Sequence, residues 1–195
     1  MISPAEWLIP TRFIGLSAYL LATICCGIAW ARGRGTPRFG RLAAVLAVLE
    51  AGLFLDMVFS IRWQLHDLLQ GEAIRANLYA QRAGPQLAAL GLLGVAVVAG
   101  IGLAFQRLRG RTGTTVAACG TILSLSCWCA EVISLHAVDA VFYSTVNGVM
   151  LVSLFWVACS LMTGLGILWE ARTARSHAGQ GAKPAGEPPS SLTDS

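Results

Sequence analysis

The chain has 195 residues, of which 55% are hydrophobic and 12% are charged, and its mean hydropathy is +0.65. This balance excludes an ordinary soluble domain and is typical of a membrane protein, with little chain left over for a soluble catalytic module. The net charge of +4 is better explained by membrane topology than by nucleic-acid binding, because the basic residues cluster between apolar segments.

Five segments reach the length of about 17–25 residues that a helix needs to cross a bilayer. They cover residues 13–31, 42–61, 87–105, 114–135 and 148–169. The sequence therefore predicts an all-α, polytopic transmembrane helix bundle within a single domain, residues 1–171. The run 29–31 has the small-x-small pattern of a signal-peptide cleavage site, but the arginines that follow it favour an uncleaved first span.

Basic residues in the connecting segments predict the orientation of the bundle. The first loop, the third loop and the C-terminal tail are rich in them: Arg32, Arg34, Arg38 and Arg41; Arg107, Arg109 and Arg111; Arg172, Arg175 and Lys183. The second loop mixes Arg75 and Arg82 with acids, and the fourth loop, near Asp139, has no Lys or Arg. We expect the N-terminus outside and the C-terminus in the cytoplasm. The preference for Arg over Lys fits a multi-pass protein of a bacterial inner (plasma) membrane.

Three shorter features complete the organisation of the chain. Helical spacing over residues 72–82 predicts a short amphipathic helix on the outer rim. Small residues recur every fourth position in the third span, at Ala96, Gly100 and Ala104 and again at Gly94, Val98 and Gly102, which predicts close helix packing there. Residues 172–195 turn to Gly, Pro, Ser and charge, a composition expected of a disordered cytoplasmic tail.

Acidic residues inside the spans are the strongest indication of a buried site. Glu50, Asp56 and Glu131 lie in the second and fourth segments, where an acid costs roughly 2.5–3.5 kcal/mol at the bilayer centre. We expect Arg62 to pair with Asp56, and a residue of another span to pair with Glu131. Glu50 is deeper and points about 120° away from Asp56 on a helix, so it should meet different neighbours.

Depth along the spans gathers polar residues near the outer boundary. They are Asp56, Arg62, His66, Glu131, His136 and Asp139. The sequence predicts that they line a polar pocket between the second and fourth spans. The first hypothesis is a redox cofactor or metal site, because His66 and His136 at one depth could ligate a b-type haem or a transition metal. The six cysteines all fall within spans and are expected to act as small apolar residues.

Two further hypotheses remain open. Arg62, Arg75 and Arg82 could attract the headgroup of a lipid- or quinone-like ligand that packs on Trp63, Tyr79 and Trp128. Alternatively, the buried polar groups could form structural ion pairs in an accessory or scaffold subunit that pairs with another membrane protein or with itself. No nucleotide-binding loop, nucleophile elbow or zinc-protease motif is present, so the sequence leaves open whether any reaction is catalysed.

Overall fold

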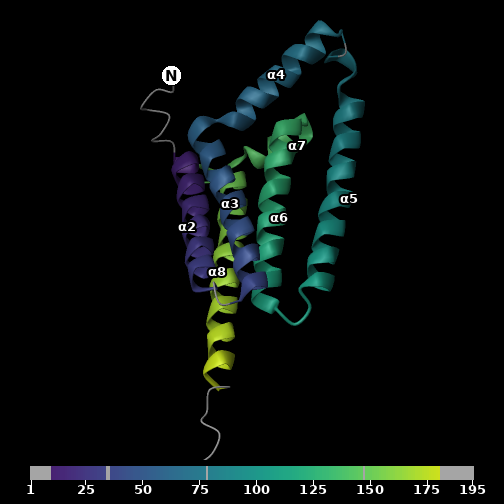
Figure 1. Cartoon of the computed structure of the whole chain (residues 1–195). Coiled ribbons are helices and arrows are strands. Elements are labelled where there is room, and N and C mark those ends of the chain that lie inside the picture. The colour runs from purple at the N-terminus through teal and green to yellow at the C-terminus, as the bar shows by residue number, and fades with distance from the viewer. Residues whose placement is uncertain (1–9, 34–35, 78, 147, 181–195) are drawn as a thin grey trace, which may run out of the picture.

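The computed structural model describes residues 10–33, 36–77, 79–146 and 148–180 (Figure 1). Its long helices are α2 (Pro10–Arg32), α3 (Pro37–Phe59), α4 (Ile61–Arg75), α5 (Ala83–Arg107), α6 (Thr112–Ile133) and α8 (Leu151–Gln180). Shorter elements are the 3-10 turn η1 (Tyr79–Gln81), helix α7 (His136–Phe142) and the strands β1 (Thr145–Val146) and β2 (Val149–Met150), which pair antiparallel.

Five helices, α2, α3, α5, α6 and α8, are long and apolar enough to cross a membrane. Each one coincides with a segment that the sequence predicts as a span, with ends that differ by a few residues except at the C-terminal end of α8, which extends to Gln180. The chain runs up and down between two ends of the bundle (Figure 1). We call the end that carries α4, α7 and the hairpin the α4 end, and the other, with the α2–α3 and α5–α6 connections, the opposite end.

The core lies between α2, α3, α6 and α8. Helix α8 packs on both α2 and α6, and α2 packs on α3. One apolar cluster, around Cys26, Ala43 and Ile167, fills the opposite half of the bundle; a second, around Tyr19, Leu53 and Trp156, fills the half nearer α4. All six cysteines are free thiols and five of them are buried, as expected of small apolar residues.

Helices α6 and α8 approach each other through glycines. A Cβ added at Gly120 would lie 2.6 Å from the Cys159 carbonyl oxygen, and one at Gly166 would lie 2.7 Å from the Gly113 carbonyl oxygen. Such separations leave no room for a side chain, so the two backbones are in direct contact. The closest glycine packing therefore belongs to the fourth and fifth spans.

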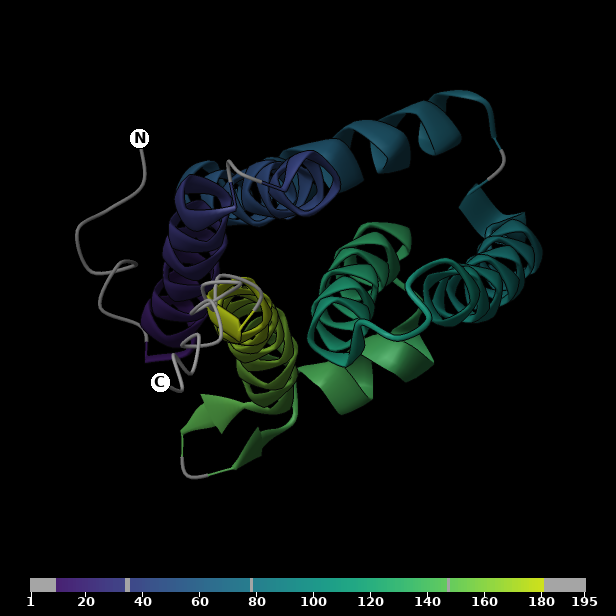
Figure 2. The same ribbon diagram turned by 60° about the horizontal axis from the view of Figure 1, so that its bottom comes forward.

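Helix α5 is the least buried of the five, although the sequence predicts close packing for it. It contacts α6 and η1 at the edge of the bundle (Figure 2). Gly100 and Ala104 face α6, whereas a Cβ added at Gly94 or Gly102 would meet nothing within 4 Å. Only one of its two small-residue faces packs on a neighbouring helix in the described fold. The sequence could not show which one, because both faces are built from similarly small residues.

The chain turns sharply between α3 and α4 at Ser60, which has the left-handed conformation (φ 56°, ψ 38°). Helix α4 starts directly after it and crosses above the bundle toward α5 (Figure 2). The outer helix expected over 72–82 is thus replaced by a longer helix over 61–75 and the separate turn η1. Asn77, with φ 56°, interrupts the helix between them, and Asn tolerates this conformation better than most residues.

Helix α8 extends beyond the boundary that the sequence suggests at Ala171 and ends at Gln180. The residues that follow Ala171 include Arg172 and Ala174, which favour helix, and the first glycine is Gly179. The remainder of the expected tail, residues 181–195, lies outside the described residues.

Candidate functional site

Three charged side chains meet at the α4 end in an ionic triad of Asp56, Arg62 and Glu131. Asp56 Oδ2 accepts a hydrogen bond from Arg62 Nε at 2.6 Å and lies 2.5 Å from Nη2, while Asp56 Oδ1 accepts one from the Arg62 backbone N–H at 2.7 Å. Arg62 Nη1 donates to Glu131 Oε2 on α6. The triad thus links α3, α4 and α6, and Arg62 is the partner of both acids.

Local backbone geometry explains why Arg62 reaches Asp56. The left-handed Ser60 ends α3, changes the direction of the chain and donates its N–H to the Asp56 carbonyl oxygen. That turn brings the first N–H groups of α4, which have no partner within their own helix, back over the last turn of α3. The Asp56 carboxylate therefore binds both the backbone and the side chain of Arg62.

The triad is almost wholly removed from solvent, with exposed fractions of 4% for Asp56, 4% for Arg62 and 3% for Glu131. Burial acts to lower the pKa of Arg62, but the charges of Glu131 and Asp56 outweigh it and hold this pKa above its usual value. The guanidinium also lies over the Trp156 ring, 5.2 Å from its centroid. Arg62 is thus a permanent cation fixed from three sides.

A cavity of about 360 Å³, the triad cavity, adjoins these residues. Its wall combines the triad with residues of α2, α3, α4, α8, β2 and the connections at the α4 end: Thr11, Arg12, Met57, Ser60, Trp63, Tyr143, Met150 and Trp156. Arg12 Nη2 donates to the carbonyl oxygens of Met57 and Val58, at 2.8 and 2.9 Å, and so binds the last turn of α3. Part of the polar wall therefore serves to join helices.

A second pocket, the lateral pocket, has a volume of about 480 Å³ and lies between α4, η1, α5 and the end of α6. Its apolar wall consists of Leu69, Ala73, Pro85, Ala89, Val132 and Ile133. Its polar wall consists of His66, Gln70, Tyr79, Arg82, Gln86 and Ser134. An apolar hollow with a few polar groups is the usual composition of a site for a small organic ligand.

The polar groups of the lateral pocket are held in place by one another. The Arg82 guanidinium stacks over the Tyr79 ring at 3.9 Å, and Gln70 Nε2 donates to the Tyr79 hydroxyl at 3.1 Å. Gln86 Nε2 donates to the carbonyl oxygens of Ile133 and Ser134, at 3.1 and 2.9 Å. These bonds tie η1 to α4, and α5 to the end of α6, so the pocket is preformed.

His66 connects the two hollows. Its Nδ1 lies 3.3 Å from the Val132 carbonyl oxygen, and its ring meets the Trp63 ring edge-on, with centroids 6.3 Å apart. Trp63 belongs to the wall of the triad cavity, while His66 belongs to that of the lateral pocket. One turn of α4 therefore separates the two hollows.

The single pocket that the sequence predicts is thus divided into two. Asp56, Arg62 and Glu131 line the triad cavity, whereas His66, Tyr79 and Arg82 line the lateral pocket. Neither wall includes Arg75, which is exposed and pairs with Glu72 at 2.6 Å, or Asp139, whose Oδ2 accepts a hydrogen bond from Ser134. The side chain of His136 lies outside the described part of the structure.

Among the described residues, no group of three or more His, Cys, Asp or Glu side chains is arranged to hold a metal ion. The carboxylates of Asp56 and Glu131 are both bound to Arg62, and His66 faces a backbone carbonyl. The pairing of His66 with His136 stays a prediction, because the side chain of His136 is not described.

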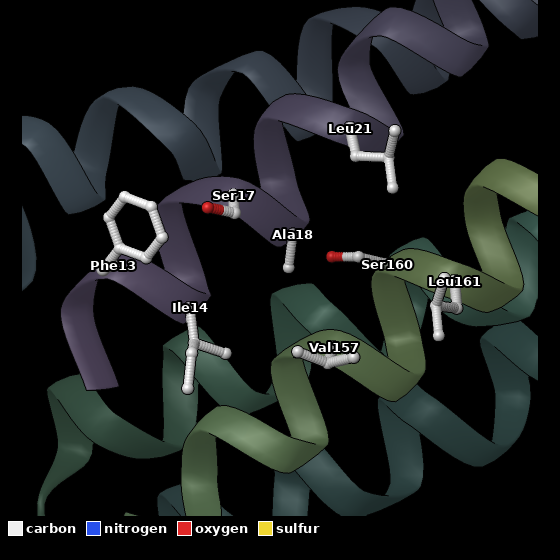
Figure 3. Close-up of a pocket in the computed structure, with 8 residues that line it drawn as sticks. All are labelled: Phe13, Ile14, Ser17, Ala18, Leu21, Val157, Ser160 and Leu161. Carbon is white, nitrogen blue, oxygen red and sulfur yellow. The ribbon is translucent and has the colours of Figure 1, made fainter. Parts of the chain in front are cut away.

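A third hollow, the α2–α8 groove, has a volume of about 280 Å³ and lies between these two helices (Figure 3). Its wall is mainly apolar and includes Phe13, Leu21, Val157 and Leu161. Ser160 points from α8 toward Ala18 on α2 (Figure 3), and its hydroxyl has no hydrogen-bond partner among the described residues. The residues that line the groove include no charged group.

Several residues of the two sites carry no distinctive signal in the sequence. Gln70 and Gln86 lie in the flanks of spans, and polar residues are common in such flanks. Arg12 precedes the first span, at the same depth in the bundle as the end of the second span. Their long side chains bind the carbonyl or hydroxyl oxygens of other elements, which depends on how the helices are arranged.

No family model, curated protein or solved structure matches this chain significantly.

Proposed function

We propose that the protein is an integral membrane protein that binds a lipid- or quinone-like amphiphile in the lateral pocket. The observation that carries the proposal is the composition of that pocket, whose lining combines apolar residues of α4, α5 and α6 with Arg82, Tyr79 and His66. An amphiphile needs both kinds of surface, and a guanidinium or an imidazole can hydrogen-bond the oxygens of its headgroup.

The position of the pocket supports this ligand class. The pocket lies at the α4 end, beside α4 and η1. There α5 begins, a helix long and apolar enough to cross a membrane. Tyr and Arg at the end of a spanning helix belong at the level of lipid headgroups, whereas Ala89 and Leu69 extend the pocket toward apolar surroundings. An amphiphile that lies in the bilayer could enter with its headgroup already at the right depth.

The cofactor hypothesis and the scaffold hypothesis have less support. A metal or haem site would need ligands besides His66, and three of the predicted pocket acids are already engaged: Asp56 and Glu131 with Arg62, and Asp139 with Ser134. A scaffold would use the small-residue face of α5 at Gly94 and Gly102, which is open but has no feature that selects a partner.

The experiment is to purify the protein in a mild detergent, extract it with organic solvent and identify the lipids and quinones by mass spectrometry. We expect one class of amphiphile to be enriched over its content in the membrane. Arg82→Gln should lower the amount bound at least fivefold. Arg75→Gln is the matched control, because it removes the same charge from an exposed site outside the pocket and should leave the amount unchanged.

Two results would overturn the proposal. One is an extract with the composition of the bulk membrane in the wild-type protein. The other is an equal loss of the enriched amphiphile in Arg82→Gln and Arg75→Gln, since that would indicate a general effect of surface charge. Loss of a co-purifying protein on bulky substitution of Gly94 and Gly102, with no enriched amphiphile, would support the scaffold alternative.

We assign the α4 end to the outer side of a bacterial inner membrane and the C-terminus to the cytoplasm. The distribution of arginine supports this assignment: Arg32, Arg38 and Arg41, together with Arg107, Arg109 and Arg111, lie at the opposite end. A periplasmic reporter enzyme fused after Lys183 should be inactive, whereas one fused after Asn77 should be active. Activity at the first position and none at the second would reverse the orientation.

A further inference from the structure

Glu50 is a buried acid that lines none of the three hollows. It lies near the middle of α3, and its exposed fraction is 0%. Thr121 and Thr163, which lie near the middle of α6 and α8, are also fully or almost fully buried. All three helices are long and apolar enough to cross a membrane, so this polar cluster lies at the centre of the bundle.

The contacts of Glu50 come from hydroxyl groups. Thr121 Oγ1 donates to Glu50 Oε1 at 2.8 Å, and it lies 3.2 Å from Thr163 Oγ1, which in turn is 3.1 Å from the Cys159 carbonyl oxygen. Glu50 Oε2 has no hydrogen-bond partner among the described residues. One carboxyl oxygen is therefore an acceptor, while the other still lacks a partner.

No cation balances Glu50 within the described part of the chain, in contrast to Asp56 and Glu131, which share Arg62. The titratable groups that interact with it electrostatically are Cys26 and Tyr19 on α2 and Cys159 on α8. These groups are themselves weak acids and cannot offset a negative charge. An unpaired carboxylate in such surroundings would cost far more than a neutral carboxylic acid.

We propose that Glu50 is a proton-binding site: a carboxylic acid that keeps its proton at neutral pH inside the bundle, with Oε1 as the hydrogen-bond acceptor and Oε2 as the protonated oxygen. Protonation turns Oε2 into a donor, and a single buried water can accept from it. Acids that hold protons within membrane spans commonly belong to proton relays. The site is independent of the lateral pocket.

The test is infrared spectroscopy of the full-length protein at neutral pH, because the carbonyl stretch of a carboxylic acid is absent from a carboxylate. The wild-type minus Glu50→Gln difference spectrum should contain that carbonyl band. Carboxylate bands in its place would overturn the proposal. So would loss of the acid band on replacing K⁺ with Na⁺, since the site would then bind a metal cation in place of a proton.

A second variant secures the assignment if Glu50→Gln does not fold. Thr121→Val keeps the shape of the side chain but removes the hydrogen bond to Oε1, so the acid carbonyl band should move to higher wavenumber. Thr115→Val is the matched control, because Thr115 Oγ1 lies within hydrogen-bonding distance of backbone carbonyls near the start of α6, and the band should not move. A band that is absent from the wild type, or unmoved in Thr121→Val, would contradict the proposal.

Discussion

Arg62 on α4 donates a hydrogen bond to Glu131 on α6, 69 positions away in the sequence. This bond fixes the start of α4 against the end of α6. His66 follows Arg62 by one turn of α4, and residues 132–134 follow Glu131 directly, so the same contact sets the distance between two walls of the lateral pocket. The buried triad thus has a structural role, because the shape of the neighbouring pocket depends on it.

Removing one acid of the triad should destabilise the protein strongly. Glu131→Gln takes away a charge but keeps the shape, and it leaves the buried Arg62 with one counter-ion. We expect a loss of about 3–5 kcal/mol in the free energy of unfolding, as is usual when a buried ion pair is broken. Reversible denaturation in detergent micelles measures this loss.

Glu72→Gln is the control for that measurement. It breaks the exposed pair of Glu72 with Arg75, and exposed pairs contribute between roughly 0 and 1 kcal/mol. Equal stability changes in the two variants would mean that the Arg62–Glu131 contact does not join the helices as described.

Glycine-to-alanine substitutions should separate packed from open glycines. In Gly120→Ala and Gly166→Ala, the new methyl group would press on backbone oxygens of the partner helix at 2.6 and 2.7 Å, so we expect each to cost about 1–3 kcal/mol. Gly94→Ala and Gly102→Ala meet nothing within 4 Å and should be neutral, or stabilising by up to about 1 kcal/mol. Thermal unfolding of the four variants measures the difference. Destabilisation at Gly94 similar to that at Gly120 would show that α5 has a close neighbour.

Tyr143, in the connection between α7 and β1, should make stability depend on alkaline pH. Burial, together with the charges of Glu131 and Asp139, raises its pKa above the usual 10.0. Below pH 10 the folded and unfolded states both keep the phenol proton. Above it the unfolded state releases the proton first, so stability falls as the pH rises. Tyr143→Phe should lose less stability than the wild type between about pH 9 and 11, as measured by thermal unfolding. Parallel curves for the two proteins would contradict the shift.

The spans could be predicted from the sequence because long apolar runs respond to a single physical requirement, the thickness of the bilayer. The pairing of Asp56 with Arg62 could also be predicted, since two charges six residues apart at a helix end have few other partners. The different neighbours of Glu50 followed from helical geometry alone.

The division of the polar site into two hollows could not be predicted. It depends on the direction of α4, which is set by the left-handed backbone of Ser60, and hydrophobic periodicity carries no information about that angle. The sequence also could not show that the close glycine contacts are in α6 and not in α5. That depends on which helix faces meet, since small residues suit both close contact and exposure to lipid.

We propose that the lateral pocket holds an amphiphile, and a bulky side chain that fills this pocket is the sharpest test of that proposal. Ala89 lies in its wall, and Ala96 lies two turns further along nearly the same face of α5, outside the pocket and exposed. The amount of co-purified amphiphile per protein should fall at least tenfold in Ala89→Trp and stay at the wild-type level in Ala96→Trp, with both proteins folded. An unchanged amount in Ala89→Trp would contradict the claim.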